Sequence, residues 1–463
     1  MKHILLLAIA VAAGCSFSPG KVDNDMSGAG GGGDDLGGVG DDLASADMTM
    51  ICTPASKTCS NGTLSTCNLD GTGIDTKTCT LGCNAAANDC AALQPTAPAV
   101  AGDFVYGGLS EPTIAATQTL LVFDTDTGEI RDGSGAVVRM PNATPMGRNV
   151  ENGIGFHRVS GVGIWTFSKL TVPATTTIVF KNPYAASILS ATDLTIAGTI
   201  DARGYADPTK ALMPGTASTL CGGTVSIAGP GGTIGGVTTT PAASEGGTVT
   251  DTTKGGGGGG YGAVGGIGGN HGGGTGGAAG AIGGAAAINP LAGGFGGGSS
   301  GGLGGGGGGA VQLAAQGTLT ISGTINSGGC GGGAGDATHG GGGGGSGGAI
   351  LVEAPTVHIT AAAILAANGG GGGGGGDAAA TAGQPGRSSA TVANSGSGAA
   401  GGQNGGNGGA GSTAAQPGID GNGGGGGGGG VGRVRLSSSS GTATTDVGST
   451  VSPDASQGTV VIQ

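Results

Sequence analysis

Cysteine is the residue type in this chain whose number and spacing most clearly indicate chemistry. Six of the nine cysteines lie between residues 52 and 90, in a segment that is rich in Thr, Asn and Gly and has no helical period. In an exported protein, an even number of cysteines at this density predicts a disulfide framework, because so short a segment cannot be stabilised by burial alone. We therefore predict disulfides among Cys52, Cys59, Cys67, Cys79, Cys83 and Cys90, whose spacing selects no single pairing.

A zinc site is the alternative for the same cysteines. Structural zinc sites commonly use Cys-x-x-Cys pairs together with further Cys or His ligands, and this segment has no such pair and no histidine. Disulfides are therefore the preferred interpretation, and no metal site is predicted. The module could be a small recognition domain, although a spacer is the commoner use of such modules. Cys221 and Cys330 are left over and could pair with each other.

The N-terminus carries a second cysteine signal. A short basic start precedes an apolar run from Ile4 to Ala13, which is too short to span a bilayer. The run ends in Ala12-Ala13-Gly14-Cys15, which resembles the lipobox of bacterial lipoprotein signal peptides. The resemblance implies a signal peptide at 1–14, cleavage before Cys15 and acylation of that cysteine. A plain secretory signal is the alternative.

The residue after the candidate lipidation site bears on location. In Gram-negative lipoproteins an aspartate there marks retention in the inner membrane, and this chain has Ser16 instead. The resemblance therefore implies the outer membrane or cell surface, with Cys15 as a lipid anchor in the membrane. Residues 15–50 then read as a tether of glycine and aspartate blocks. Such a segment cannot bury enough apolar surface to fold, so we predict a disordered spacer.

The composition excludes several classes of function. The net charge is -12 and aromatic residues make up 3% of the chain, which argues against nucleic-acid binding. No phosphate-binding loop, nucleophile elbow or ligand-spaced histidine pair is present. We therefore predict that the protein is not an enzyme and binds no cofactor.

Two acidic motifs bear on metal binding and catalysis. Asp124-x-Asp126-x-Gly128 could begin a calcium loop, but the fifth position is glycine and no glutamate follows at the twelfth, so a turn is favoured. Asp201, Arg203 and Asp207 form the tightest charged group near a predicted strand. They are the basis of one alternative, a carbohydrate-active β-helix enzyme.

A repeated phrase predicts the elements that carry these residues. The stretch Leu194–Gly204 matches Leu319–Gly328, and a weaker copy begins at Val357. Each copy follows a short apolar strand and alternates Leu or Ile with Thr or Ser, which predicts one inward and one outward face. We therefore predict an all-β fold, a solenoid-like or barrel-like stack of short strands, with a β-sandwich as the alternative.

Glycine accounts for 118 of the 463 residues, most of them between 255 and 430. Many recur at steps of three, as in Gly259, Gly262, Gly265 and Gly268 before a break at His271. A three-residue period suits a left-handed helix with three residues per turn, and the scarcity of proline argues against collagen. The inserts are predicted to pack as polyglycine II helices, with disorder as the alternative.

Together these features resemble uncharacterised glycine-rich surface lipoproteins of Gram-negative bacteria. The matching stretches are Leu194–Gly204, Gly304–Leu313, Gly341–Ala354 and Gly423–Leu436. Runs such as Gly255–Tyr261 are more distantly similar to the glycine-rich domain of anaplastic lymphoma kinase type receptors, in which polyglycine helices form a bundle. Neither resemblance implies a catalytic residue.

The predicted organisation has three parts after the tether. These are the cysteine module at 51–91, an aromatic-containing β region at 98–205 and a glycine-rich repeat region at 206–463. The leading hypothesis for function is a cell-surface lipoprotein with a structural, adhesive or interaction role, whose partner would be a surface glycan or a protein. A non-catalytic glycan- or protein-binding module, using the aromatic residues of 98–205, is the second alternative.

Overall fold

The computed structural model describes residues 50–204, 221, 227–236, 243–376, 379–399 and 401–463. The predicted signal peptide, the lipidation site Cys15 and the tether at 16–49 lie outside these residues. The chain divides into two compact units, Met1–Met50 and Ile51–Gln463. Almost all of the described structure therefore belongs to the second unit.

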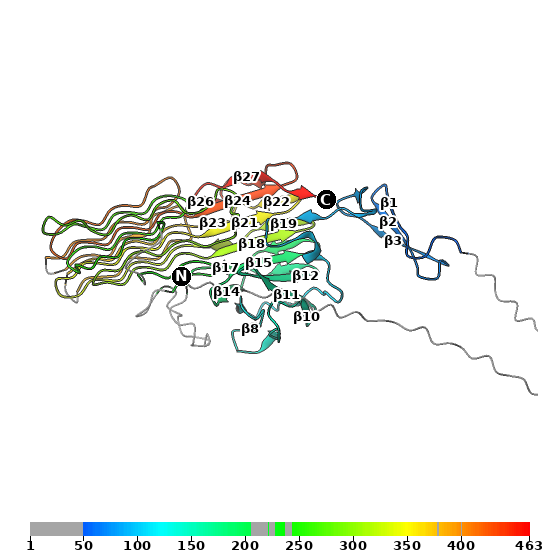
Figure 1. The fold of residues 1–463 in the computed structure, drawn as a ribbon, viewed down its shortest axis with the longest axis horizontal. Coiled ribbons are helices and arrows are strands. Elements are labelled where there is room, and N and C mark those ends of the chain that lie inside the picture. The colour runs from blue at the N-terminus through cyan, green and yellow to red at the C-terminus, as the bar shows by residue number, and fades with distance from the viewer. Residues whose placement is uncertain (1–49, 205–220, 222–226, 237–242, 377–378, 400) are drawn as a thin grey trace, which may run out of the picture. The chain divides into compact units, whose positions relative to one another are not determined.

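The centre of the second unit is a solenoid of three sheets, through which each rung passes in turn (Figure 1). The first sheet contains β10 (Asn149–Glu151), β11 (Ile154–Val159), β12 (Val162–Phe167), β15 (Ala185–Ser190), β18 (Ala310–Ala315), β21 (Ala349–Glu353), β24 (Arg433–Ser438) and β27 (Ser456–Thr459). The second contains β13 (Leu170–Val172), β16 (Leu194–Ile196), β19 (Thr318–Ile321), β22 (Thr356–Ile359) and β25 (Thr444–Thr445). The third contains β26 (Thr450–Ser452), β23 (Ile364–Ala366), β20 (Thr324–Asn326), β17 (Thr199–Asp201), β14 (Thr177–Lys181), β7 (Leu120–Asp124), β8 (Ile130–Asp132) and β9 (Val137–Arg139).

Successive rungs pair in parallel, and the register explains the repeated phrase. Leu194 of β16 pairs with Leu319 of β19, which pairs with Val357 of β22. These positions are buried, so the apolar residues of every copy stack inside the solenoid. The all-β stack predicted from the phrase is confirmed as a solenoid. Strands that come before residue 205 in the chain and strands that come after it lie in the same sheets of the solenoid.

One end of the solenoid is covered by antiparallel strands. β10 and β11 extend the first sheet from β12, and β8 and β9 extend the third sheet from β7. Beneath them Trp165 contacts Phe123 and Phe156, with ring centroids 5.1 and 5.0 Å away. The aromatic residues of this region thus form part of the solenoid core.

Glycine is required at two of the corners where a rung turns from the second sheet to the third, those between β16 and β17 and between β19 and β20. A Cβ on Gly198 would lie 2.2 Å from the carbonyl oxygen of Thr176, and one on Gly323 would lie 1.9 Å from that of Gly198. Both distances are impossible for a real side chain. The glycine inside the phrase is therefore the residue that lets consecutive corners stack.

The inserts between rungs form a bundle of extended segments, here called the glycine bundle, which lies on one side of the sheets in Figure 1. Its segments cover residues 227–236, 243–249, 255–270, 274–284, 291–309, 327–335, 340–348, 367–376, 381–386, 393–399, 402–420 and 423–432. Several of them continue a rung directly. The segment at 340–348 runs into β21, and the segment at 423–432 runs into β24.

The backbone hydrogen bonds of the glycine bundle follow a period of three. Along 255–260, N–H groups three residues apart donate to the same neighbouring segment. The pairs are Gly255 to Gly269 and Gly258 to Gly266, then Gly256 to Gly341 and Gly259 to Gly344, then Gly257 to Gly247 and Gly260 to Ser244. Each segment therefore turns once per three residues and binds a different neighbour on each side. This is the polyglycine II packing predicted from the glycine spacing.

The remaining strands lie outside the solenoid. The cysteine module contains β1 (Lys57–Ser60), β2 (Thr63–Cys67), β3 (Ile74–Thr78), β4 (Cys83–Asn84) and β5 (Asp89–Cys90). A connecting strap at 92–106 contains β6 (Leu93–Gln94) and the 3-10 helix η1 (Ala101–Phe104), and β6 pairs antiparallel with β28 (Val461–Ile462). Among the described residues, no helix is both long and apolar enough to cross a bilayer.

Candidate functional site

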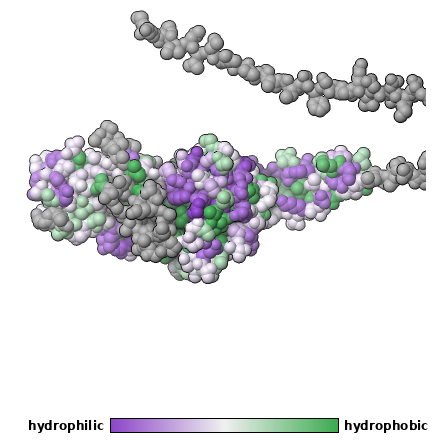
Figure 2. Space-filling view, turned by 90° about the horizontal axis from the view of Figure 1, so that it is seen from below, coloured by the Kyte–Doolittle hydropathy of each residue, from purple (hydrophilic) through white to green (hydrophobic). Residues whose placement is uncertain are grey.

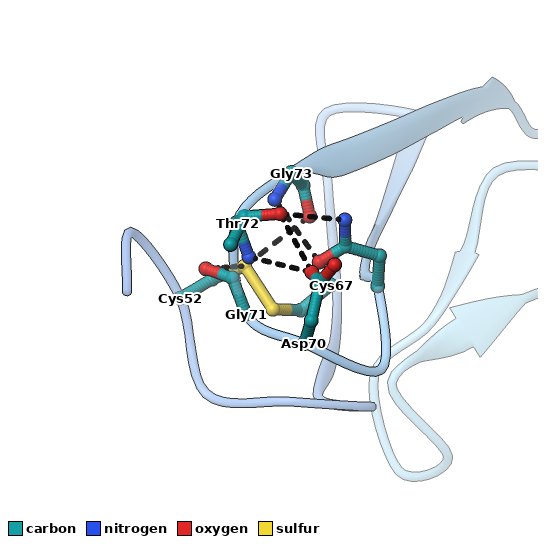
Figure 3. The surroundings of a disulfide bond; sticks show 7 residues. Cys52, Cys67, Asp70, Gly71, Thr72 and Gly73 are labelled. Carbon is teal, nitrogen blue, oxygen red and sulfur yellow. Dashed lines mark hydrogen bonds between the residues drawn. A yellow bond between two sulfur atoms is a disulfide. The ribbon is translucent and has the colours of Figure 1, made fainter. Parts of the chain in front are cut away.

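The cysteine module is held by three disulfides, which join Cys52 to Cys67, Cys59 to Cys83 and Cys79 to Cys90. Figure 3 shows the first of these beside the turn at Asp70–Gly73, where the Asp70 carboxylate accepts hydrogen bonds from Thr72. The predicted disulfide framework is confirmed, and its pairing is new information. Several disulfides in one chain indicate folding in an oxidising compartment.

The sulfur atoms of Cys59, Cys79 and Cys83 lie within 4.8 Å of one another. All three are disulfide-bonded, so in this state none can act as a thiolate ligand. A fourth disulfide joins Cys221 to Cys330 of the glycine bundle, the pairing that the sequence left open.

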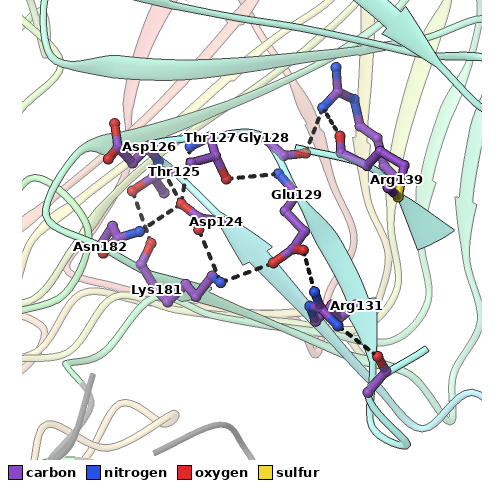
Figure 4. A network of polar contacts seen from close by, with 12 residues as sticks. Asp124, Thr125, Asp126, Thr127, Gly128, Glu129, Arg131, Arg139, Lys181 and Asn182 are labelled. Atoms are coloured by element: carbon purple, nitrogen blue, oxygen red, sulfur yellow. Dashed lines mark hydrogen bonds and ion pairs between the residues drawn. The ribbon is translucent and has the colours of Figure 1, made fainter. Parts of the chain in front are cut away.

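A network of charged side chains occupies the antiparallel end of the solenoid (Figure 4). Lys181 Nζ lies 3.0 Å from Asp124 Oδ2 and 3.2 Å from Glu129 Oε2, and Arg131 Nη2 lies 2.6 Å from Glu129 Oε1. Burial opposes ionisation of Asp124. Hydrogen bonds from Asn182, Lys181 and Thr127 nevertheless hold the pKa of Asp124 below its ordinary value. Burial also opposes ionisation of Glu129, but Arg131 and Lys181 lower the pKa of its carboxyl group.

The same network bears on the possible calcium loop. Asp124 Oδ1 accepts hydrogen bonds from the N–H groups of Asp126 and Thr127, which is the pattern of an aspartate turn. Its other oxygen faces Lys181, and Asp126 forms an ion pair with Arg158. The carboxylates therefore already have cationic partners, which favours the turn interpretation. In Figure 2, hydrophilic residues gather over the middle of the face that is shown.

A second polar cluster joins the strap to β11. Tyr106 Oη lies 2.9 Å from His157 Nδ1, and Asp103 Oδ1 lies 3.5 Å from His157 Nε2. Asp103 is fully buried and also pairs with Arg148. Burial lowers the pKa of His157 despite the attraction of Asp103, and burial raises the pKa of Tyr106 to about 12. The cluster holds the strap against β11. None of the groups in the cluster is accessible enough to act as a general base.

The strap is also fixed to the outer face of the first sheet. Glu353 of β21 accepts hydrogen bonds from the N–H and hydroxyl of Thr96, and its Oε2 lies 2.7 Å from Gln312 Nε2. Gln312 also donates to the carbonyl oxygen of Thr96 and accepts from Ser187. Every polar group here is used internally, so the buried Glu353 has a structural role.

The aromatic residues of 98–205, on which the binding-module alternative depends, are mostly in the core. Phe123, Phe156, Trp165, Phe167 and Phe180 are all at most 2% exposed. They therefore provide no exposed platform for stacking a sugar ring. The charged group named for the enzyme alternative is self-paired, because Arg203 Nε and Nη2 donate to Asp201 at 3.0 and 2.6 Å. Asp207 lies outside the described residues.

The phrase carries a feature that the sequence reasoning missed. Threonine recurs between two buried apolar positions on the second sheet and directly before a buried isoleucine on the third sheet, and these threonines pair from rung to rung. On the second sheet Thr171 pairs with Thr195 and Thr195 with Thr320, and on the third sheet Thr177 pairs with Thr199 and Thr199 with Thr324. The signal was present in the repeated Leu-Thr-Ile and Gly-Thr-Ile triplets.

Comparison with known proteins adds no further assignment. No family model, no curated protein and no solved structure matches this chain. The function must therefore be argued from the chain's own residues.

Proposed function

We propose that this chain is a lipid-anchored surface protein with a structural or adhesive role. The proposal takes Cys15 as the acylated anchor, residues 16–50 as a tether, and the outer membrane of a Gram-negative bacterium as the location. A surface glycan or a protein would be the partner. Support comes from the lipobox resemblance and from the disulfides, which suit an exported protein.

The observation that carries the proposal is the way in which the body uses its polar groups. The glycine bundle pairs its buried N–H groups with neighbouring segments, and the buried carboxylates Asp103, Asp124 and Glu353 each bind several donors. Such an arrangement produces rigidity rather than a reactive group in a cleft. A rigid, exported and disulfide-bonded body is suited to holding a surface at a distance from its anchor.

The anchor is tested by replacing Cys15 with Ala in the full-length chain and separating membranes from soluble fractions. We expect membrane association and fatty-acid labelling to be lost in Cys15→Ala and retained in the neighbouring control Ser16→Ala. Surface labelling of whole cells, followed by an adhesion assay, then tests the role. Membrane association of Cys15→Ala equal to that of the original chain would contradict the anchor.

A further inference from the structure

The outer surface of the solenoid carries two parallel columns of threonines, here called the threonine ladder. The second-sheet column is formed by Thr171, Thr195, Thr320 and Thr444, and the third-sheet column by Thr177, Thr199, Thr324 and Thr450. His358 replaces threonine in the first column and Ile364 in the second, both in the same rung. The two columns flank the corner between the second and third sheets, which contains Gly198 and Gly323 in two of the rungs.

On the second sheet the alternation of burial directs these side chains outward, and on the third sheet Thr177, Thr199 and Thr324 each precede a fully buried isoleucine. Thr195 is half-buried between the fully buried Leu194 and Ile196, and Thr320 has the same position between Leu319 and Ile321. Parallel pairing places threonines of adjacent rungs about 4.8 Å apart. The ladder therefore presents hydroxyl groups at a regular interval along the solenoid axis.

The hydroxyls of the ladder have no partner within the described part of the chain. Other threonines do use their hydroxyls, as Thr176 Oγ1 donates to the carbonyl of Gln118 and Thr192 Oγ1 to that of Ser168. None of the eight ladder hydroxyls forms a hydrogen bond with a described residue. Each hydroxyl is thus free to donate one hydrogen bond and to accept others.

The net charge of the chain restricts the partner of the ladder. His358 interrupts the first column, and its Nε2 lies 3.1 Å from both carboxylate oxygens of Asp446. The whole chain carries a net charge of -12, which repels polyanions. A nucleic acid or an anionic lipid surface is therefore a poor match, whereas an uncharged polymer rich in hydroxyl groups fits.

We propose that the threonine ladder binds a neutral polysaccharide chain lying along the solenoid axis. This inference rests on the proposed adhesive role and names its partner class and its surface. Threonine is β-branched and stiff, so little side-chain freedom is lost on binding. Each contact is weak, and repetition over several rungs supplies the affinity, without the aromatic stacking that this surface lacks.

The test uses the purified full-length chain and four neutral probes: cellulose, chitin, dextran and a β-1,3-glucan. Dextran sulfate serves as the anionic comparison. The variants Thr195→Val with Thr320→Val, and Thr199→Val with Thr324→Val, remove two hydroxyls each while keeping the shape and strand preference. The control is Thr275→Val with Thr413→Val, which changes two exposed threonines of the glycine bundle.

We expect the original chain to bind at least one neutral probe. Because two hydrogen bonds are lost, we expect about tenfold weaker binding for each ladder variant and unchanged binding for the control. Thermal unfolding of all variants should match the original chain, because the hydroxyls make no internal bond. The proposal is overturned if no neutral probe is bound, if dextran sulfate alone is bound, or if both ladder variants bind like the original. A chain that reaches the surface through Cys15 but fails this test leaves the anchored scaffold intact.

Discussion

Replacing Gly343 with Ala tests whether glycine is used here to let backbones touch. Gly343 lies in the buried segment 340–348, where its N–H donates to Gly298. A Cβ at this position would lie 1.9 Å from the carbonyl oxygen of Gly257, whereas ordinary contact begins at 3.4 Å. The two segments would have to separate by roughly the difference between these distances.

That separation determines the magnitude of the effect. The segments are joined on either side of the clash by the bonds from Gly256 to Gly341 and from Gly259 to Gly344, both 2.9 Å long. Each buried bond that is lost costs about 1–3 kcal/mol, and overpacking adds about 1–3 kcal/mol. The lower entropy of the unfolded alanine chain returns only about 0.4–1 kcal/mol. With both bonds lost, we therefore expect a net destabilisation of about 2–9 kcal/mol.

The assay is amide hydrogen exchange, read by mass spectrometry over residues 255–262 and 340–348. A loss of about 3 kcal/mol corresponds to exchange about a hundred times faster in both segments. The matched control is Gly107→Ala, because a Cβ there meets nothing within 4 Å and the backbone is not left-handed. Exchange in Gly343→Ala at the same rate as in the original chain and in Gly107→Ala would refute the spacing role of glycine.

Two further predictions concern the antiparallel end of the solenoid. Arg139 is fully buried, burial lowers its pKa to about 10, and its guanidinium donates to the carbonyls of Ile154 and Gly128. Arg139→Met should therefore lower the free energy of unfolding by about 3–5 kcal/mol, measured by urea unfolding with tryptophan fluorescence as the readout. The exposed control Arg131→Met should lower it by less than about 1 kcal/mol. A cost for Arg139→Met no larger than that of the control would contradict this. Burial also holds the pKa of His157 below its ordinary value of 6.5, so the unfolded chain takes up the proton first and stability falls as the pH drops below 6.5. His157→Gln should flatten the pH dependence of unfolding below pH 6.5, and an unchanged slope would count against a buried neutral histidine.

The rungs could be predicted because the alternation of apolar and polar residues in their sequence indicates strands with one buried face. Leucine and isoleucine must alternate with polar residues for a strand to have one inward face, and the copies at Leu194 and Leu319 align in the observed register. The three-residue glycine step likewise predicted helices with three residues per turn. The break at His271 is a turn, where the segment ending at Asn270 reverses into the one that starts at Gly274.

The neighbours within the bundle could not be predicted, since a glycine has no side chain to distinguish one partner from another. Gly256, for example, donates to Gly341, a residue in a different insert. The strap is a similar case, because the contact of Thr96 with Glu353 spans 257 positions and leaves no local pattern. The cysteine pairing was open for a related reason, since spacing alone does not fix which strands meet.

The edges of the glycine bundle show how a sequence can end such a lattice. Val264 and Ile267 are one turn apart and about half exposed, at 52% and 51%, and the N–H of neither donates to another described residue. Inside the bundle, a side chain in this position would collide with the next segment, as the 1.9 Å distance at Gly255 illustrates. At the surface the side chain instead occupies the place where a further segment would pack.

Asparagine ends the lattice in a second way. Asn404 Oδ1 accepts a hydrogen bond from the N–H of Gly398, and Asn407 Oδ1 accepts one from the N–H of Ser395, both at 2.8 Å. The side-chain amide thus replaces the carbonyl that a further segment would supply, and the N-G-G-N-G-G spacing repeats this at every turn. Glycine therefore marks the sides on which a segment has neighbours. A larger residue at the same three-residue step marks the side that faces water, so no further segment packs there.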